Sequence, residues 1–173
     1  MTSDIHTIRS KEQCTTIDDE TFSTVERLIL THDGTVMRLL ETLTGQSVDV
    51  DIVTRTVRED MLYRHVKLKP PGDSEPLAWA ESEVDLASLD AEYADELREG
   101  NVGIGKLFRE QRSETFRELV DVGLVTADDR RPSFVEPDAE VLFERTYDIY
   151  HDDTDIMTIT EYFPKGEFEQ FLP

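Results

Sequence analysis

Glu161 is a carboxylate that the sequence places among apolar residues. It lies in the segment Ile156–Pro164, which is rich in β-branched and aromatic residues and ends at a proline, as is typical of a β-strand. Successive side chains of a strand point to opposite faces, so Glu161 shares its face with Met157, Ile159 and Phe163. Burying a carboxylate costs several kcal/mol unless the group finds a partner or gives up its charge. Glu161 is therefore expected either to form a structural ion pair or to take part in chemistry.

Two arginines occupy comparable positions in two other segments. Arg64 lies on the apolar face of Leu62–Leu68, and Arg145 lies on that of Val141–Ile149. If the three segments belong to one sheet, two guanidinium groups and one carboxylate converge in a largely apolar cavity. Each guanidinium can bind a carboxylate through two parallel hydrogen bonds, so the set favours a small anionic ligand. A buried Arg–Glu–Arg triad that only stabilises the sheet is an equally good interpretation of the same spacing.

The rest of the chain favours such a sheet. Strand patterns are found at residues 48–57, 61–69, 77–86, 114–122, 141–149 and 156–164. In the fourth of these we expect Phe116, Val120 and Val122 to share a face. Helical patterns begin at Asp18 or Asp19 and at Thr35, with shorter ones at 89–99 and 103–108. We predict an α+β fold, a single antiparallel sheet of about six strands flanked by short helices, with no internal repeat.

Length and composition bound the organisation of the chain. With 173 residues, we expect a loosely ordered leader at 1–17 and one domain at 18–173. No run approaches the ~18 apolar residues that a membrane helix needs, and the first residues lack a signal peptide's pattern, so we expect a cytoplasmic protein. The single Cys14 cannot form an intrachain disulfide. We expect no metal site, because metal-ligand spacing is missing among His6, His32, His65 and His151.

The chain is strongly acidic, with 39 acidic against 18 basic residues and a net charge of −21. The acidic residues are spread along the chain, which indicates a property of the folded surface. Such a surface repels phosphates, so we expect no binding to nucleic acid or to an anionic membrane. It suits a salt-rich cytoplasm and suggests a halophilic source. An anionic substrate must then be attracted by a local positive cavity.

Gly100–Leu107 has the glycine and lysine spacing of a phosphate-binding loop, but Leu107 stands where a Ser or Thr would hold magnesium. We therefore do not predict a nucleotide site here. The glycines still allow backbone N–H groups to approach an anion closely.

Five stretches of the sequence, in this order, resemble the chorismate–pyruvate lyase family, particularly its archaeal branch. They are Leu28–Thr35, Leu62–Val66, Glu75–Ala80, Gly103–Phe108 and Thr160–Pro164. The resemblance implies an antiparallel sheet flanked by helices, in agreement with the strand and helix patterns. It also implies a relation to the ligand-sensing domain of some bacterial transcription regulators.

The resemblance implies roles for five residues. Arg64 matches the arginine that binds the ring carboxylate of the substrate, and Glu161 matches the acidic residue near the ring oxygen. Thr35 and Ile104 fall where the family offers backbone N–H groups from two covering flaps. Arg145 matches a basic position that can take the second carboxylate.

The activity that the resemblance implies is elimination of pyruvate from chorismate, which gives 4-hydroxybenzoate without a metal or an organic cofactor. The product ring is aromatic, so the enzyme mainly has to orient a dianion and stabilise developing charge. We expect a monomer or a small homo-oligomer. The alternative is a noncatalytic sensor or binding module for an aromatic acid, against which the acidic surface and the lack of a DNA-binding domain argue.

Overall fold

The sheet of the protein has six strands, and all neighbouring strands run antiparallel. The computed structural model describes residues 20–100, 103–110, 114–126, 132–135 and 140–172; the predicted leader at 1–17, with Cys14, lies outside the described residues. The strands are arranged in the order β1-β2-β3-β6-β5-β4. Their bounds are β1 Asp49–Arg58, β2 Met61–Lys69, β3 Ala78–Asp85, β4 Phe116–Thr126, β5 Val141–His151 and β6 Thr154–Pro164. The predicted α+β fold with a single antiparallel sheet is confirmed.

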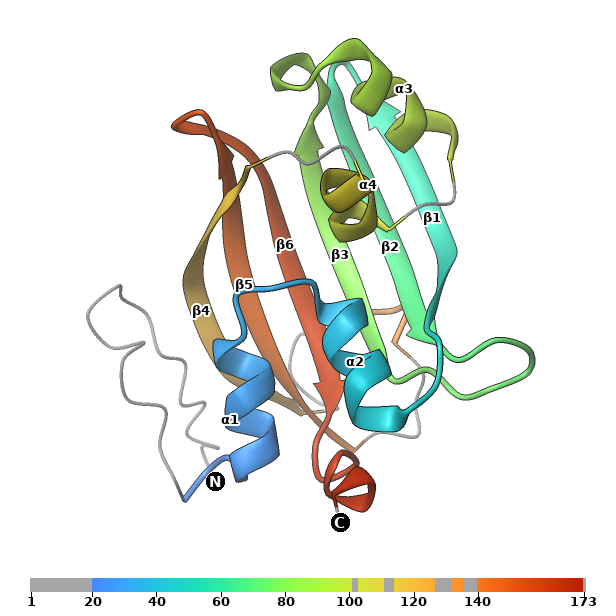
Figure 1. The fold of residues 1–173 in the computed structure, drawn as a ribbon, viewed down its shortest axis with the longest axis vertical. Helices are drawn as coiled ribbons and strands as arrows, with labels where there is room; N and C mark the ends of the chain where they lie inside the picture. The colour runs from blue at the N-terminus through green and yellow to red at the C-terminus, as the bar shows by residue number, and fades with distance from the viewer. Residues whose placement is uncertain (1–19, 101–102, 111–113, 127–131, 136–139, 173) are drawn as a thin grey trace.

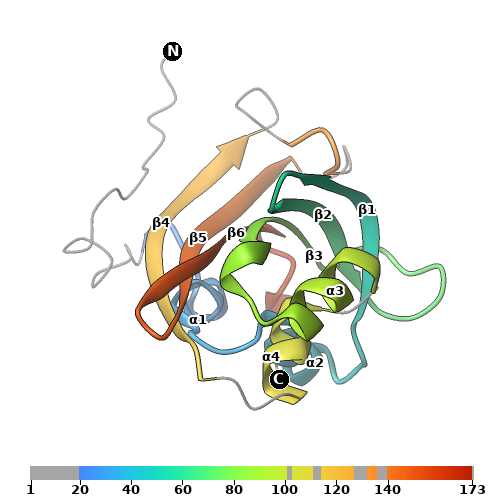
Figure 2. The ribbon, with the colours of Figure 1, turned by 90° about the horizontal axis from the view of Figure 1, so that it is seen from above.

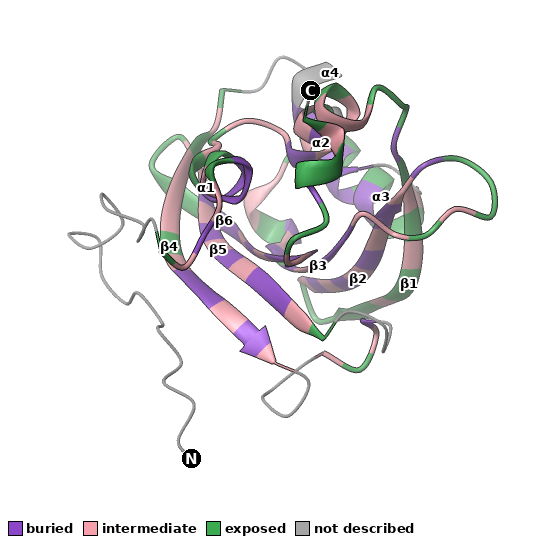
Figure 3. Ribbon diagram, turned by 90° about the horizontal axis from the view of Figure 1, so that it is seen from below, coloured by how far each residue is buried: buried purple, intermediate pink, exposed green. Residues whose placement is uncertain are grey.

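The helices lie on one face of the sheet, which curves around them (Figures 1 and 2). The α-helices are α1 Thr24–Thr31, α2 Val36–Thr44, α3 Ala91–Glu99 and α4 Ile104–Glu110, and the 3₁₀ turns are η1 Leu86–Ser88 and η2 Glu169–Phe171. Along β2 and β5, buried residues alternate with partly buried ones (Figure 3). The buried faces are those that carry Arg64 and Arg145, as the alternation predicted.

The connectivity of the chain repeats itself. Two helices followed by three strands, α1–α2–β1–β2–β3, are succeeded by α3–α4–β4–β5–β6. Each set of strands is a meander, and the two meanders join through the antiparallel pair β3–β6 at the centre of the sheet. The repeat that sequence analysis did not detect is therefore present in the topology.

Helix α1 begins later than the predicted Asp18 or Asp19, because its N-cap is Ser23. The Ser23 hydroxyl accepts from the Glu26 N–H at 3.3 Å, and Glu26 accepts in return from the Ser23 N–H at 2.9 Å. This capping box satisfies two backbone donors that the helix cannot satisfy internally. Glu26 is fully buried and also accepts from Lys165 Nζ at 3.0 Å and from the Gly166 N–H at 2.9 Å. One carboxylate therefore joins α1 to the end of β6.

The prediction that Phe116 and Val122 share a face of β4 is wrong. Phe116 is 66% exposed, whereas Val122 is 0% exposed. The pairing of β4 with β5 shifts between Leu119 and Asp121, so Val120 is an extra residue in a β-bulge. A bulge reverses the alternation on one side of it, because strand side chains have a period of two. As a result Arg117 faces the inside of the sheet.

Replacing Glu26 by alanine is expected to lower the free energy of unfolding by about 3 kcal/mol, because the change leaves the donors of Lys165 and Gly166 without their buried acceptor. The measurement is denaturant unfolding followed by circular dichroism at high salt. Leu28→Ala is the matched control on the same helix; its side chain is 58% exposed, and a change below about 0.5 kcal/mol is expected. Equal effects of the two substitutions would contradict the role given to Glu26.

Candidate functional site

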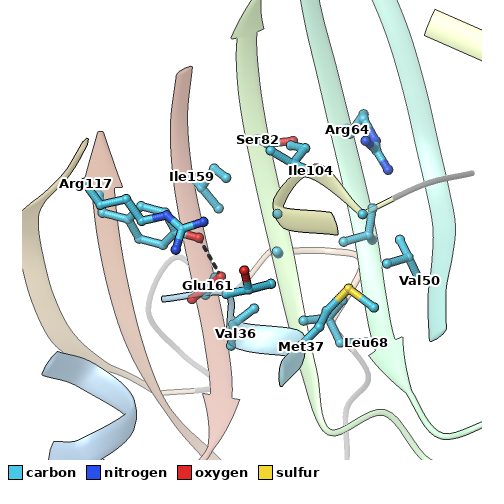
Figure 4. Close-up of a pocket in the computed structure, with 16 residues that line it drawn as sticks. Val36, Met37, Val50, Arg64, Leu68, Ser82, Ile104, Arg117, Ile159 and Glu161 are labelled. Atoms are coloured by element: carbon cyan, nitrogen blue, oxygen red, sulfur yellow. Dashed lines mark hydrogen bonds between the residues drawn. The ribbon is translucent and has the colours of Figure 1, made fainter. Parts of the chain in front are cut away.

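A cavity opens on the concave face of the sheet, at the N-terminal ends of α2 and α4 (Figure 4). It holds about 550 Å³ of space between atoms, including its opening to solvent. Most of its lining residues are apolar, and the polar side chains are those of Thr35, Arg64, Ser82, Arg117, Tyr147 and Glu161. A mostly apolar cavity with a few convergent polar groups is typical of a small-molecule site.

Glu161 lines this cavity from β6, and protein donors hold both of its oxygens. Arg145 Nε donates to Oε2 at 2.7 Å, and the Tyr147 hydroxyl donates to Oε1 at 2.7 Å. Glu161 is 1% exposed and Arg145 is 2% exposed, so the ion pair is buried. A carboxylate oxygen can accept more than one hydrogen bond, so Glu161 is fixed in orientation and can still accept from a ligand.

Arg145 is engaged on the side away from the cavity. Besides Glu161, its Nη1 donates to two carbonyl oxygens at the end of α1, those of Ile29 and His32, each at 2.6 Å. Burial, the largest single influence, lowers the pKa of Arg145, but the Glu161 charge, Tyr147, the hydrogen bond to Glu161 and the Asp33 charge together outweigh burial and raise it. The sequence analysis predicted that Arg145 and Glu161 lie close together, and they do, but Arg145 is not among the residues that line the cavity. Its guanidinium lies behind the carboxylate.

Arg64 lines the cavity from β2, at some distance from Glu161 (Figure 4). It pairs with Ser82 of β3, which pairs with Ile159 of β6, so two strand spacings separate Arg64 from the strand of Glu161. This corresponds to roughly 10 Å across the sheet. Arg64 is 2% exposed, and burial, with a smaller contribution from Arg55, lowers its pKa to about 10. A bound anion would counteract that shift, since an opposite charge favours the charged form.

The two predicted flaps meet at the cavity. Thr35 is the N-cap of α2 and Ile104 is the first residue of α4, and both line the cavity. A Cβ atom at Gly105 would lie 2.6 Å from Thr35 Cγ2, and one at Gly103 would lie 2.8 Å from Met37 Sδ. A side chain at Gly105 or Gly103 would therefore require Thr35 or Met37 to move. Both helices begin beside the same space, and the N-terminus of a helix favours an anion.

Arg117 and Tyr147 are cavity residues that the sequence analysis missed. The bulge in β4 turned Arg117 inward, and no feature of the sequence marks a bulge at Val120. Tyr147 belongs to the apolar face of Val141–Ile149 that also carries Arg145, but the sequence analysis gave it no role. Its position two residues from Arg145 on that face was a usable signal, because a buried phenol needs a hydrogen-bond partner.

The remaining candidates lie away from the cavity. His65 is on the opposite face of β2, where its ring stacks on Phe134 with centroids 4.3 Å apart. Among the described residues, no group of His, Cys, Asp and Glu could hold a metal ion. In the same part of the chain, every helix is too short or too polar to span a bilayer. Residues 101 and 102 of the glycine-rich segment lie outside the described residues, and Gly103 leads into α4.

Known proteins resemble the chain in sequence and in structure. A family model described as "Chorismate pyruvate-lyase Rv2949c-like" matches residues 30–172. A protein of Methanocaldococcus jannaschii named "Putative lyase MJ0807" is 30% identical over 143 residues, 80% of this chain and 77% of the relative. The solved structure of PhnF from Mycobacterium smegmatis has a TM-score of 0.55 and 15% identity, over 79% of this chain and 66% of that one. The likeness to PhnF concerns the fold, and the chain spans just under two thirds of the PhnF chain.

The pH dependence of stability should report the buried Tyr147 hydroxyl. Burial, and then the Glu161 charge, raise the pKa of Tyr147 well above its ordinary value of 10.0. Above pH 10.0 the unfolded chain releases this proton and the folded chain keeps it, so the stabilisation is complete below that pH and is lost as the pH rises. In denaturant titrations, the unfolding free energy of the wild type should fall more steeply above this pH than that of Tyr147→Phe. Parallel curves would contradict the assignment.

Proposed function

The chain belongs to the Rv2949c-like chorismate pyruvate-lyase family, as the sequence resemblance predicted, and on this premise we propose that it eliminates pyruvate from chorismate to give 4-hydroxybenzoate. One observation carries the proposal: Arg64 and a carboxylate held by two donors, Glu161, line the same apolar cavity from strands that lie roughly 10 Å apart. That separation suits a six-membered ring with a carboxylate at one end and an oxygen at the other.

In the proposed reaction, Arg64 binds the ring carboxylate and Glu161 accepts a hydrogen bond from the ring oxygen at the opposite end. The bond between the ring carbon and the ether oxygen breaks, the neighbouring ring carbon that bears the hydroxyl loses its proton, and the electron pair of that C–H bond completes the aromatic ring. The departing enolate takes up a proton and becomes pyruvate. Because aromatisation supplies the driving force, the side chains act mainly by orientation and electrostatics.

Arg145 and the flaps have supporting roles in this proposal. The sequence analysis gave Arg145 to the second carboxylate, but its Nε and Nη1 already serve Glu161 and two carbonyl groups. We therefore assign it the positioning of Glu161. The backbone N–H groups near Thr35 and Ile104 would cover the substrate and exclude water during the reaction.

The test is to mix the purified protein with chorismate at high salt and to measure 4-hydroxybenzoate and pyruvate. Both should appear in equal amounts. Arg64→Ala should lower kcat/KM at least about 100-fold by removing the buried cation, and Glu161→Gln should lower kcat about 100-fold. Arg38→Ala, an exposed arginine on α2 outside the cavity lining, is the control and should change either value less than twofold.

A binding module is the other outcome of that test. If the wild type releases neither product but 4-hydroxybenzoate still raises its melting temperature, the lyase proposal fails and a sensor for aromatic acids replaces it. Loss of folding in Arg64→Ala would instead favour a purely structural role of Arg64, so circular dichroism of each variant accompanies the assay.

The net charge of −21 supports a second proposal, that the protein works in the salt-rich cytoplasm of a halophile. Repulsion between surface carboxylates is long-ranged in dilute salt and is screened within about 3 Å at 1 M. The melting temperature should therefore fall by several degrees or more when KCl is reduced from molar to roughly 0.1 M. A protein that stays folded and fully active in dilute salt would contradict this.

A further inference from the structure

We propose that Arg117 binds the second carboxylate of the substrate, the one on the enolpyruvyl group, and so makes the cavity selective for a dicarboxylate over a monocarboxylate. The inference rests on the proposed function for the identity of the ligand. It concerns a residue to which neither the resemblance nor the family match gave a role.

Arg117 reaches the cavity from the edge of the sheet remote from Arg64. It lies on β4, whereas Arg64 lies on β2, and both line the cavity. The guanidinium carbon of Arg117 is 5.7 Å from the centroid of the Tyr147 ring, whose hydroxyl donates to Glu161. Figure 4 shows Arg117 on the Glu161 side of the cavity and Arg64 on the other side. The two cations therefore lie at opposite ends of the same space.

The hydrogen bonds of Arg117 leave one edge of its guanidinium for a ligand. Nη1 donates to the carbonyl oxygen of Asp33, in the connection between α1 and α2, at 2.8 Å. Nε is buried and has no hydrogen-bond acceptor within the described part of the chain. The edge formed by Nε and Nη2 has the geometry that binds a carboxylate through two parallel hydrogen bonds. A buried donor is costly when its bond is not made, so a ligand acceptor here would be stabilising.

The charges that line the cavity match a dianion. Arg145 lies behind Glu161 and compensates its charge, and Tyr147 stays neutral because burial raises its pKa. This leaves Arg64 and Arg117 as the cationic side chains described at the cavity wall. Two separated guanidinium groups correspond to the two carboxylates of chorismate. 4-Hydroxybenzoate has one carboxylate, and the other leaves with pyruvate, so Arg117 would distinguish substrate from product.

The rival explanation is that Arg117 only fastens the α1–α2 connection through Asp33. The two explanations differ in their effect on the two ligands. If Arg117 only holds the α1–α2 connection in place, its loss would disturb that connection and weaken the binding of every ligand to the same extent. If Arg117 binds a carboxylate of the ligand, its loss would weaken the binding of the dicarboxylate alone.

The experiment measures dissociation constants of chorismate and 4-hydroxybenzoate by calorimetry in a Glu161→Gln background, in which turnover is expected to be about 100-fold slower. Adding Arg117→Ala should weaken the binding of chorismate about 10- to 100-fold and the binding of 4-hydroxybenzoate less than about twofold. Adding Arg64→Ala should weaken the binding of both ligands, and adding the control Arg38→Ala should change the binding of neither. Arg117→Lys keeps the charge without the planar fork and should recover part of the chorismate affinity. If the Glu161→Gln protein does not fold, KM for chorismate and product inhibition by 4-hydroxybenzoate give the same comparison in the otherwise wild-type enzyme.

Equal weakening of both ligands by Arg117→Ala, or unchanged chorismate affinity, would overturn the inference. Neither result would contradict the proposed function, which is tested by turnover of chorismate in the wild-type protein. Conversely, a wild type that binds both ligands without turnover would refute the lyase but leave the comparison at Arg117 valid. A wild type that binds neither ligand refutes both.

Discussion

The buried contact between Arg145 and Glu161 is the interaction on which the arrangement of the cavity depends. It joins neighbouring strands β5 and β6, and through the carbonyls of Ile29 and His32 it also holds the end of α1. Two buried charges are tolerated only when each has a partner, because removing either one leaves the other charge unpaired in a medium of low polarity. The contact therefore determines where the Glu161 oxygens point and where the chain leaves α1 toward the flap at Thr35.

In each half of the chain, an arginine of the sheet binds carbonyl oxygens at the end of a helix. Arg145 donates to carbonyls at the end of α1, and Arg55 of β1 donates to the carbonyls of Arg98 and Gly100 at the end of α3. These carbonyls have no partner within their own helix, so they are natural acceptors for a cation. Thr35 and Gly105, at the N-terminal ends of α2 and α4, both line the cavity, and a Cβ atom added to Gly105 would lie 2.6 Å from Thr35 Cγ2. The ends of the two helices are therefore closely spaced beside the cavity.

Alternation along the strands was sufficient to predict the burial of Arg64, Arg145 and Glu161, because a period of two assigns each residue to a face. It could not predict which neighbour a guanidinium would bind, since that depends on distances across the sheet and on the helix above it. For this reason Arg145 was assigned to the ligand and lies behind Glu161 instead. Arg117 escaped notice because one extra residue at Val120 reverses the alternation. The start of α1 was misjudged because several acidic residues precede Ser23 and each could serve as an N-cap.

The repeated order of two helices and three strands makes the halves of the sheet comparable position by position. Arg64 on β2 corresponds to Arg145 on β5, and the residues paired with them on the central strands are Ser82 and Glu161. In one half the guanidinium faces an internal counter-ion; in the other a small hydroxyl occupies the equivalent place. A pseudo-symmetric framework therefore places a serine beside Arg64 and a hydrogen-bond-accepting carboxylate beside Arg145. The two ends of the cavity differ for this reason, so an unsymmetrical ligand would meet different groups in its two possible orientations.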